Sequence, residues 1–253
     1  MEKCTIMMVT FNRLDLTKKT IEELFKNTKR PFNMVVVDNG SEDDTVPYLT
    51  DRLSSAVNNT SLNDFTIINN NKNLGIAIGR NKCLLASAKW NDQWLATIDN
   101  DVILPNGWLS KCIESLEKNK NFGAIGVNFE KSTFPIIEKN GCKIQFKKQG
   151  NLGTACMVFN RKLHKLLGFF NYADYGKYGE EDSDFGMRVR VAGFSLGYIE
   201  ENGKHLGEGD MDAGSYREFK TASHKNNLKK FNENCRDYIL GKKPIYIPYQ
   251  DGC

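Results

Sequence analysis

The first half of the chain alternates short apolar runs with helical patterns, and this alternation restricts the possible fold more than any other feature. Apolar runs of strand length occur at residues 5–9, 33–37, 65–68 and 94–98. Segments with helical spacing of apolar residues lie between them. Strands that alternate with helices form right-handed βαβ units, so the sequence predicts an α/β fold with a largely parallel sheet.

Polar residues follow each of these four runs. They lie at residues 10–12, 38–39, 73 and 99–101. Because ligands bind beyond the carboxyl ends of parallel strands, we expect these residues to lie around one site. The fourth run delivers Asp99 and Asp101 to its tip, and unpaired buried charge is costly. A hard divalent cation that carries phosphate oxygens is the natural partner for such a pair.

The second half of the chain has a different pattern. We predict strands at 123–127, 142–146, 153–159 and 196–199, a short helix at 163–167, a helix that opens at the acidic segment 179–184, and a lysine-rich amphipathic helix at 216–239. No repeat, low-complexity tract or proline-rich linker interrupts the 253 residues. The sequence therefore predicts a single domain over residues 1–210, with a helical extension at 211–253 packed on it.

Composition narrows the class of protein. The formal net charge of +4 is too small to indicate nucleic-acid binding without a local cluster. Seven cysteines without a CxxC pair indicate a reducing cytoplasm. No signal peptide is recognisable, and no apolar run reaches the length of a spanning helix. Any contact with a membrane is expected to be peripheral.

Five motifs in order carry a family resemblance. They are residues 9–13 (VTFNR), 36–41 (VVDNGS), 73–75 with 79–81 (NLG and GRN), 99–101 (DND) and 181–182 (ED). A lone Asp-x-Asp triplet is common by chance, whereas five motifs in series are specific. Together they resemble the family 2 glycosyltransferases of the GT-A fold, over about residues 3–206. The resemblance implies a single-domain, Rossmann-like fold with a mixed, mostly parallel central sheet flanked by helices.

The resemblance also implies a donor of the nucleoside diphosphate sugar type, a Mn²⁺ or Mg²⁺ ion and, usually, inversion at the anomeric carbon. Asp101 is then the expected metal ligand, and Asp99 is expected to reach the ribose hydroxyls with Asn100 beside it. The segment 205–209 matches the histidine-glycine region of the family only loosely. His205 is a candidate third ligand, and the alternative is an ordinary surface or core histidine.

The nucleotide pocket implied by the resemblance involves the earlier motifs. Asp38 is expected to accept a hydrogen bond from the nucleobase, with the alternative that it is a turn residue. The other residues expected at the donor are Thr10, Asn12, Asn73, Gly75, Arg80, Gly153 and Thr154. Asn73 and Gly75 could equally serve turn geometry alone.

Asp182 is the proposed general base, because inverting transfer needs a carboxylate that takes the proton of the attacking hydroxyl. Glu181 is expected to hold an acceptor hydroxyl. The clustered acidic residues at 180, 181, 182 and 184 should raise one another's pKa by repulsion. The alternative is an acidic helix start favoured by the helix dipole.

Two other functions compete with a glycosyltransferase. A nucleotidyltransferase would be expected to carry a glycine-rich loop after the first strand, whereas residues 10–13 contain no glycine. A non-catalytic nucleotide- or carbohydrate-binding module could have the same fold. The presence of both Asp101 and Asp182 argues against such a module, because these are the residues expected to carry the activity. The acceptor could be a glycan, a lipid-linked glycan or another hydroxyl compound. The basic terminal helix leaves a nucleic-acid acceptor open.

Overall fold

The N-terminal half of the protein forms the regular part of an α/β fold. A computed structural model describes residues 3–57, 59–130, 132–207 and 215–250. The elements of this half are β1 (Cys4–Thr10), α1 (Leu14–Asn27), β2 (Phe32–Asp38), α2 (Thr45–Ala56), β3 (Leu62–Asn69), α3 (Ile76–Ala86), a 3₁₀ turn (Ser87–Lys89), β4 (Trp94–Asp99), β5 (Val102–Ile103) and α4 (Trp108–Lys118).

The C-terminal half extends the same sheet and adds a long helix. Its elements are β6 (Phe122–Asn128), β7 (Ile136–Lys139), β8 (Cys142–Lys147), β9 (Cys156–Asn160), α5 (Arg161–Leu167), α6 (Tyr172–Tyr175), α7 (Glu181–Val191), β10 (Ser195–Asn202), β11 (Lys204–His205) and α8 (Ser215–Ile239). The predicted strands and helices are all present. The short elements β5, β7, β11 and α6 were not predicted.

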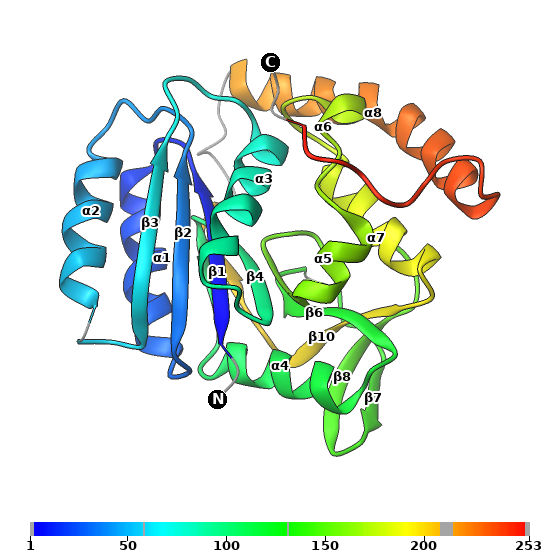
Figure 1. Cartoon of the computed structure of the whole chain (residues 1–253), viewed down its shortest axis with the longest axis horizontal. Helices are drawn as coiled ribbons and strands as arrows, with labels where there is room; N and C mark the ends of the chain where they lie inside the picture. The colour runs from blue at the N-terminus through cyan, green and yellow to red at the C-terminus, as the bar shows by residue number, and fades with distance from the viewer. Residues whose placement is uncertain (1–2, 58, 131, 208–214, 251–253) are drawn as a thin grey trace.

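Nine strands form one mixed sheet in the order β3-β2-β1-β4-β9-β6-β10-β8-β7. Strands β1 to β4 are parallel, and β6 and β10 continue in the same direction. Strands β9 and β8 run against their neighbours. The sheet is therefore mixed and mostly parallel, as the family resemblance implied, and helices flank it (Figure 1).

Side chains alternate between two hydrophobic cores, one on each face of the sheet. In β1, Ile6 and Met8 belong to the core under α1, α2 and α4, whereas Met7 and Val9 belong to the core under α3, α5 and α7. This period of two is the geometry of a strand buried on both faces. It explains why the parallel strands appear in the sequence as continuous apolar runs.

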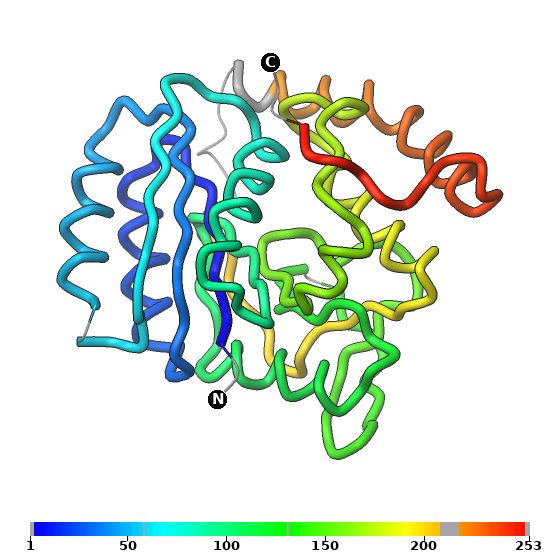
Figure 2. Tube along the Cα trace, in the orientation of Figure 1, coloured from blue at the N-terminus to red at the C-terminus, as the bar shows by residue number. Residues whose placement is uncertain are grey.

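Helix α8 and the chain after it close the C-terminal side. Helix α8 packs against α6 and α7. Figure 2 shows the final segment turning back from the end of α8 toward α6. There Ile247 exchanges backbone hydrogen bonds with Leu167 and Phe169. The predicted domain boundary at residue 210 lies outside the described residues and stays a prediction.

Ser41 follows β2 and does not cap α2, which begins only at Thr45, after Asp44. Ser41 donates its hydroxyl to Asp38 within the turn after β2. Within the described part of the chain, every helix is too short or too polar to span a lipid bilayer. The six cysteines described form no disulfide with one another.

Candidate active site

A cleft of about 920 Å³ lies where the parallel strands end. The register pairs Thr10 with Asp38 and Val9 with Asp99, so the ends of β1, β2 and β4 lie side by side. The structure brings nearly all of the predicted site residues to the cleft: Thr10, Asn12, Asn73, Gly75, Arg80, Asp99, Asn100, Asp101, Gly153, Thr154, Glu181, Asp182 and His205. Asp38 is the predicted residue that does not line it.

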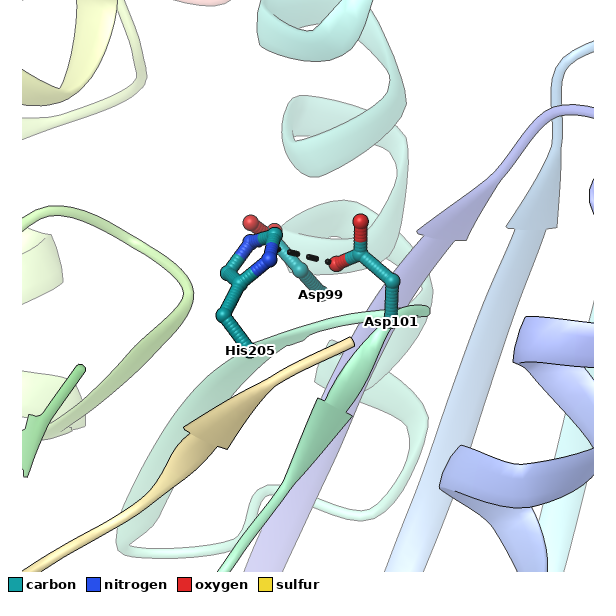
Figure 3. Close-up of side chains that lie close together, drawn as sticks. All are labelled: Asp99, Asp101 and His205. Carbon is teal, nitrogen blue, oxygen red and sulfur yellow. Dashed lines mark ion pairs between the residues drawn. The ribbon is translucent and has the colours of Figure 1, made fainter. Parts of the chain in front are cut away.

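Asp99, Asp101 and His205 gather at one corner of the cleft (Figure 3). Each offers one ligand atom, and these atoms lie within 4.8 Å of one another. Asp99 and Asp101 flank the turn after β4. His205 reaches them because β11 pairs with β5, which places His205 opposite Val102. The His205 Nε2 atom is 3.5 Å from Asp101 Oδ1.

The surroundings of Asp101 suit a bound cation. The side chain is buried, and burial together with the neighbouring Asp99 raises the pKa of Asp101. A Cβ atom at Gly207 would lie 2.6 Å from Asp101 Oδ2, so the glycine leaves room next to that oxygen. Two carboxylates and an imidazole are donors that Mn²⁺ accepts, and Mg²⁺ prefers the oxygens. The residues present therefore fit a divalent cation.

Arg13 reaches the same corner, although the sequence did not indicate a role for it. Its Nη1 atom donates to Asp101 Oδ2 at 3.1 Å. Asn12 and Arg13 have left-handed backbones, with φ of 54° and 63°. Asn12 is held in this conformation by hydrogen bonds with Ser41 and Glu42. The strained loop after β1 thus aims a guanidinium at the carboxylates.

Arg80 links the metal corner to the acidic start of α7. This buried guanidinium lies 3.1 Å from Asp99 Oδ1 and 2.9 Å from Glu181 Oε1. The other Glu181 oxygen accepts the backbone N–H of Gly179 at 3.0 Å. Burial and the adjacent Asp182 raise the pKa of Glu181 to about 7, against the opposing charge of Arg80. Both Glu181 oxygens are thus engaged within the protein.

Asp182 is the more accessible carboxylate of the pair. It lines the cleft in the first turn of α7, where Oδ1 accepts the N–H of Ser183 at 2.6 Å. Gly153 faces it: a Cβ atom at Gly153 would lie 3.9 Å from Asp182 Oδ2. Gly153 and the adjoining Thr154 thus line the cleft next to this carboxylate.

Asp38 has a different environment from the one expected. Its side chain is fully buried, and its oxygens accept the N–H groups of Gly40 and Ser41 and the Ser41 hydroxyl at 3.0, 2.8 and 2.5 Å. Its neighbour Asn39 lines the cleft in its place. The geometry matches the alternative of a turn residue, and contact with a nucleobase stays a prediction.

Asn73 and Gly75 shape the loop that enters α3. Asn73 accepts the N–H of Gly75 at 2.9 Å. Gly75 has φ of 90°, and a Cβ atom there would lie 2.5 Å from the backbone of Lys177. The next residue, Ile76, donates its N–H to the Lys177 carbonyl at 3.0 Å. Gly75 therefore allows the loop before α7 to pack against the start of α3.

Asn100 secures the turn between the two aspartates. Its amide donates to the hydroxyls of Thr10 and Thr17 at 3.1 and 3.0 Å. An aspartate at this position could not donate these hydrogen bonds. The middle residue of the triplet thus fixes the positions of Asp99 and Asp101.

Helix α8 contributes cleft residues that the sequence analysis did not identify. Phe219, Lys220, Thr221 and His224 line the cleft. His224 Nδ1 lies 2.6 Å from Oε1 of the buried Glu180. Lysines in a polar helix are typical of a solvated face, so no local signal distinguishes Lys220 from its neighbours.

Comparison with known proteins finds solved structures with a similar fold. The structure is similar to the mannosyltransferase PcManGT from Pyrobaculum calidifontis in complex with GDP-Man and Mn²⁺, with a TM-score of 0.65 and 16% identity over 95% of this chain and 69% of that one. It is also similar to S. aureus TarS 1–349 in complex with UDP-GlcNAc, with a TM-score of 0.59 and 15% identity over 94% and 71% of the two chains.

A longer form of S. aureus TarS gives a TM-score of 0.60 at 14% identity, and this chain spans 43% of it. A comparison with curated proteins finds no match.

The family model for glycosyl transferase family 2 matches residues 5–166, which is more than half of the chain. The matched region ends before Glu181, Asp182 and His205. In the structure these three residues line the same cleft. The chain therefore belongs to glycosyl transferase family 2 and has the GT-A fold.

Proposed function

We propose that this protein transfers a sugar from a nucleoside diphosphate sugar to an acceptor hydroxyl, with a divalent cation bound and with inversion at the anomeric carbon. One observation carries the proposal: the cluster of Asp99, Asp101 and His205 shares a cleft with the accessible carboxylate of Asp182. A cation site and a base in one cleft are the two parts that such a reaction requires.

Asp99, Asp101 and His205 would hold the cation. When bound, Mn²⁺ or Mg²⁺ would neutralise the charge that develops on the departing diphosphate. Arg80 holds Asp99 through an ion pair, and Asn100 holds the turn through its hydrogen bond to Thr10. These contacts keep the carboxylates in place before a ligand arrives.

Asp182 would take the proton of the acceptor hydroxyl. We propose that Glu181, whose oxygens contact Arg80 and Gly179, orients the start of α7. Each carboxylate oxygen accepts more than one hydrogen bond, so Glu181 would also hold an acceptor hydroxyl while it keeps these partners. Gly153 and Thr154, which line the cleft next to Asp182, would contact the donor sugar.

Family membership favours this activity over that of a nucleotidyltransferase. Of the similar structures, one contains GDP-Man and another UDP-GlcNAc, which supports a nucleotide sugar as the donor. A glycan or lipid-linked glycan is the acceptor that we propose, and a nucleic-acid acceptor is the alternative that the lysines of α8 leave open.

The test is a screen of nucleotide sugars with Mn²⁺, read by thermal stabilisation and by release of the nucleoside diphosphate. Because a ligand that binds the native state raises the melting temperature, a true donor should stabilise the protein. The Asp182→Asn variant is the matched control: it should be stabilised equally and release far less diphosphate. Stabilisation of the wild type without turnover of any sugar, alone or with glycan acceptors, would favour a binding module.

A further inference from the structure

Helix α8 attaches to the catalytic side of the protein through a polar face. Asn227 donates its side-chain amide to the carbonyls of Tyr175 and Tyr178 at 2.8 and 3.0 Å. Asn234 donates to the Tyr175 hydroxyl at 2.7 Å, and Tyr238 donates to Asp184. Positions 227, 234 and 238 recur on one side of a helix. These contacts fix α8 relative to α6 and α7.

The same face continues toward the cleft at the N-terminal end of α8. His224 contacts the buried Glu180, and Lys220 lies one helical turn before it. The Lys220 ammonium is 5.2 Å from the centre of the Tyr178 ring. Lys220 is partly buried, whereas Lys225, on another side of the helix, is exposed and lies outside the cleft. The anchored helix therefore directs a lysine into the cleft.

Lys220 shares its cleft with the corner where the cation would bind. Lys220 lines the same cleft as Asp99, Asp101 and His205. Arg13 and Arg80 already contact Asp101 and Asp99. A diphosphate brings further negative charge to this corner, and charge-assisted contacts to phosphate oxygens suit a flexible lysine.

We propose that Lys220 binds the diphosphate of the donor, so that α8 forms one wall of the donor site. This inference rests on the proposed function, because it requires a nucleoside diphosphate in the cleft. Sugar transfer converts the donor to a nucleoside diphosphate, and the contact with Lys220 would hold that group both before and after transfer.

The test compares diphosphates with nucleosides in wild type, Lys220→Gln and the control Lys225→Gln. Binding of UDP, GDP, ADP, CDP and dTDP with Mn²⁺ is measured by calorimetry, and binding of the matching nucleosides by NMR titration. The Lys220→Gln variant loses a charged hydrogen bond, so its affinity for diphosphates should be about tenfold or more weaker than that of the wild type. Nucleoside binding should be unchanged, as should both affinities in Lys225→Gln. The difference in diphosphate affinity between the wild type and Lys220→Gln should become smaller at high salt.

Lys220→Arg keeps the charge and should restore most of the affinity, which a merely structural role of the lysine side chain would not predict. Equal diphosphate binding by wild type and Lys220→Gln overturns the role of Lys220 and leaves the proposed function standing. An equal loss of nucleoside and diphosphate binding also overturns it, because the lysine would then support the pocket as a whole. If the wild type binds no nucleoside diphosphate, the proposed function fails and this inference fails with it.

Discussion

Arg80 and Glu181 form a buried ion pair, 2.9 Å between Nη1 and Oε1, that joins α3 to the start of α7. Both side chains are only 7% exposed. Because Arg80 also contacts Asp99, it connects the end of β4 with the acidic pair that contains Asp182. One guanidinium thus positions the two groups of carboxylates on which the proposed chemistry depends.

Replacing Arg80 with methionine should destabilise the fold strongly. Breaking a buried pair by removing one partner leaves an uncompensated charge and costs about 3–5 kcal/mol. The matched control is Arg52→Met, whose pair with Glu22 is more exposed and should contribute about 1 kcal/mol or less. Urea unfolding measures both free energies. Similar losses of unfolding free energy in the two variants would show that the Arg80 pair stabilises the fold no more than an exposed pair does.

The raised pKa of Glu181, about 7, predicts a pH-dependent stability. Folding favours the protonated form, so this contribution is present below the unfolded pKa near 4.5 and is lost as the pH rises through about 7. Glu181→Gln cannot ionise. Its melting temperature relative to wild type should therefore rise between pH 4.5 and 8, measured by thermal unfolding at constant ionic strength. A difference that does not change with pH would contradict the raised pKa.

The sheet and the clustering of polar residues were predictable from local patterns. Parallel strands bring their carboxyl ends to one edge, so residues that follow separate strands, such as Thr10 and Asp99, must meet. The apolar runs show these strands directly, because β1, β2 and β4 are buried on both faces of the sheet. The roles of the individual residues stay predictions.

Other parts of the site depend on contacts that local patterns do not contain. His205 reaches Asp101 through the pairing of β11 with β5, two strands of two residues each, which are too short to show a periodicity. The environment of Asp38 follows from the turn at Gly40 and Ser41. Helix α8 attaches through amides and hydroxyls, including Asn227, so a search for an apolar face could not reveal its orientation.

Asp101→Ala should abolish transfer and sharply weaken nucleotide binding while the fold persists. The variant removes a ligand from the cluster and also relieves the burial of a carboxylate, so we expect little loss of stability. Treatment of the wild type with EDTA should have the same effect on activity, and added Mn²⁺ should reverse it. Full activity in the presence of chelator would contradict the proposed dependence on metal.

Asp38→Ala should lower stability, because it leaves the N–H groups of Gly40 and Ser41 without their acceptor. Each buried group left unsatisfied costs about 1–3 kcal/mol. If Asp38 also contacts the nucleobase, the donor KM should rise while kcat at saturating donor stays constant. Unfolding and steady-state kinetics separate these effects. A destabilised variant with unchanged donor affinity would limit Asp38 to its turn.

Asp182→Asn should be the variant that separates binding from chemistry. The substitution keeps the size of the side chain and removes the base, so nucleotide affinity should survive while transfer falls by a factor of about 10² to 10⁴. Glu181→Gln should act more through acceptor affinity, if Glu181 holds an acceptor hydroxyl, and through the position of α7, because Glu181 contacts Arg80 and Gly179.

The stereochemistry of the product is the independent check on this role. A base that deprotonates the acceptor for direct attack predicts inversion at the anomeric carbon, which NMR of the first product formed can establish. Retention of configuration, or near-normal transfer by Asp182→Asn, would remove Asp182 from the mechanism even with the cation site confirmed.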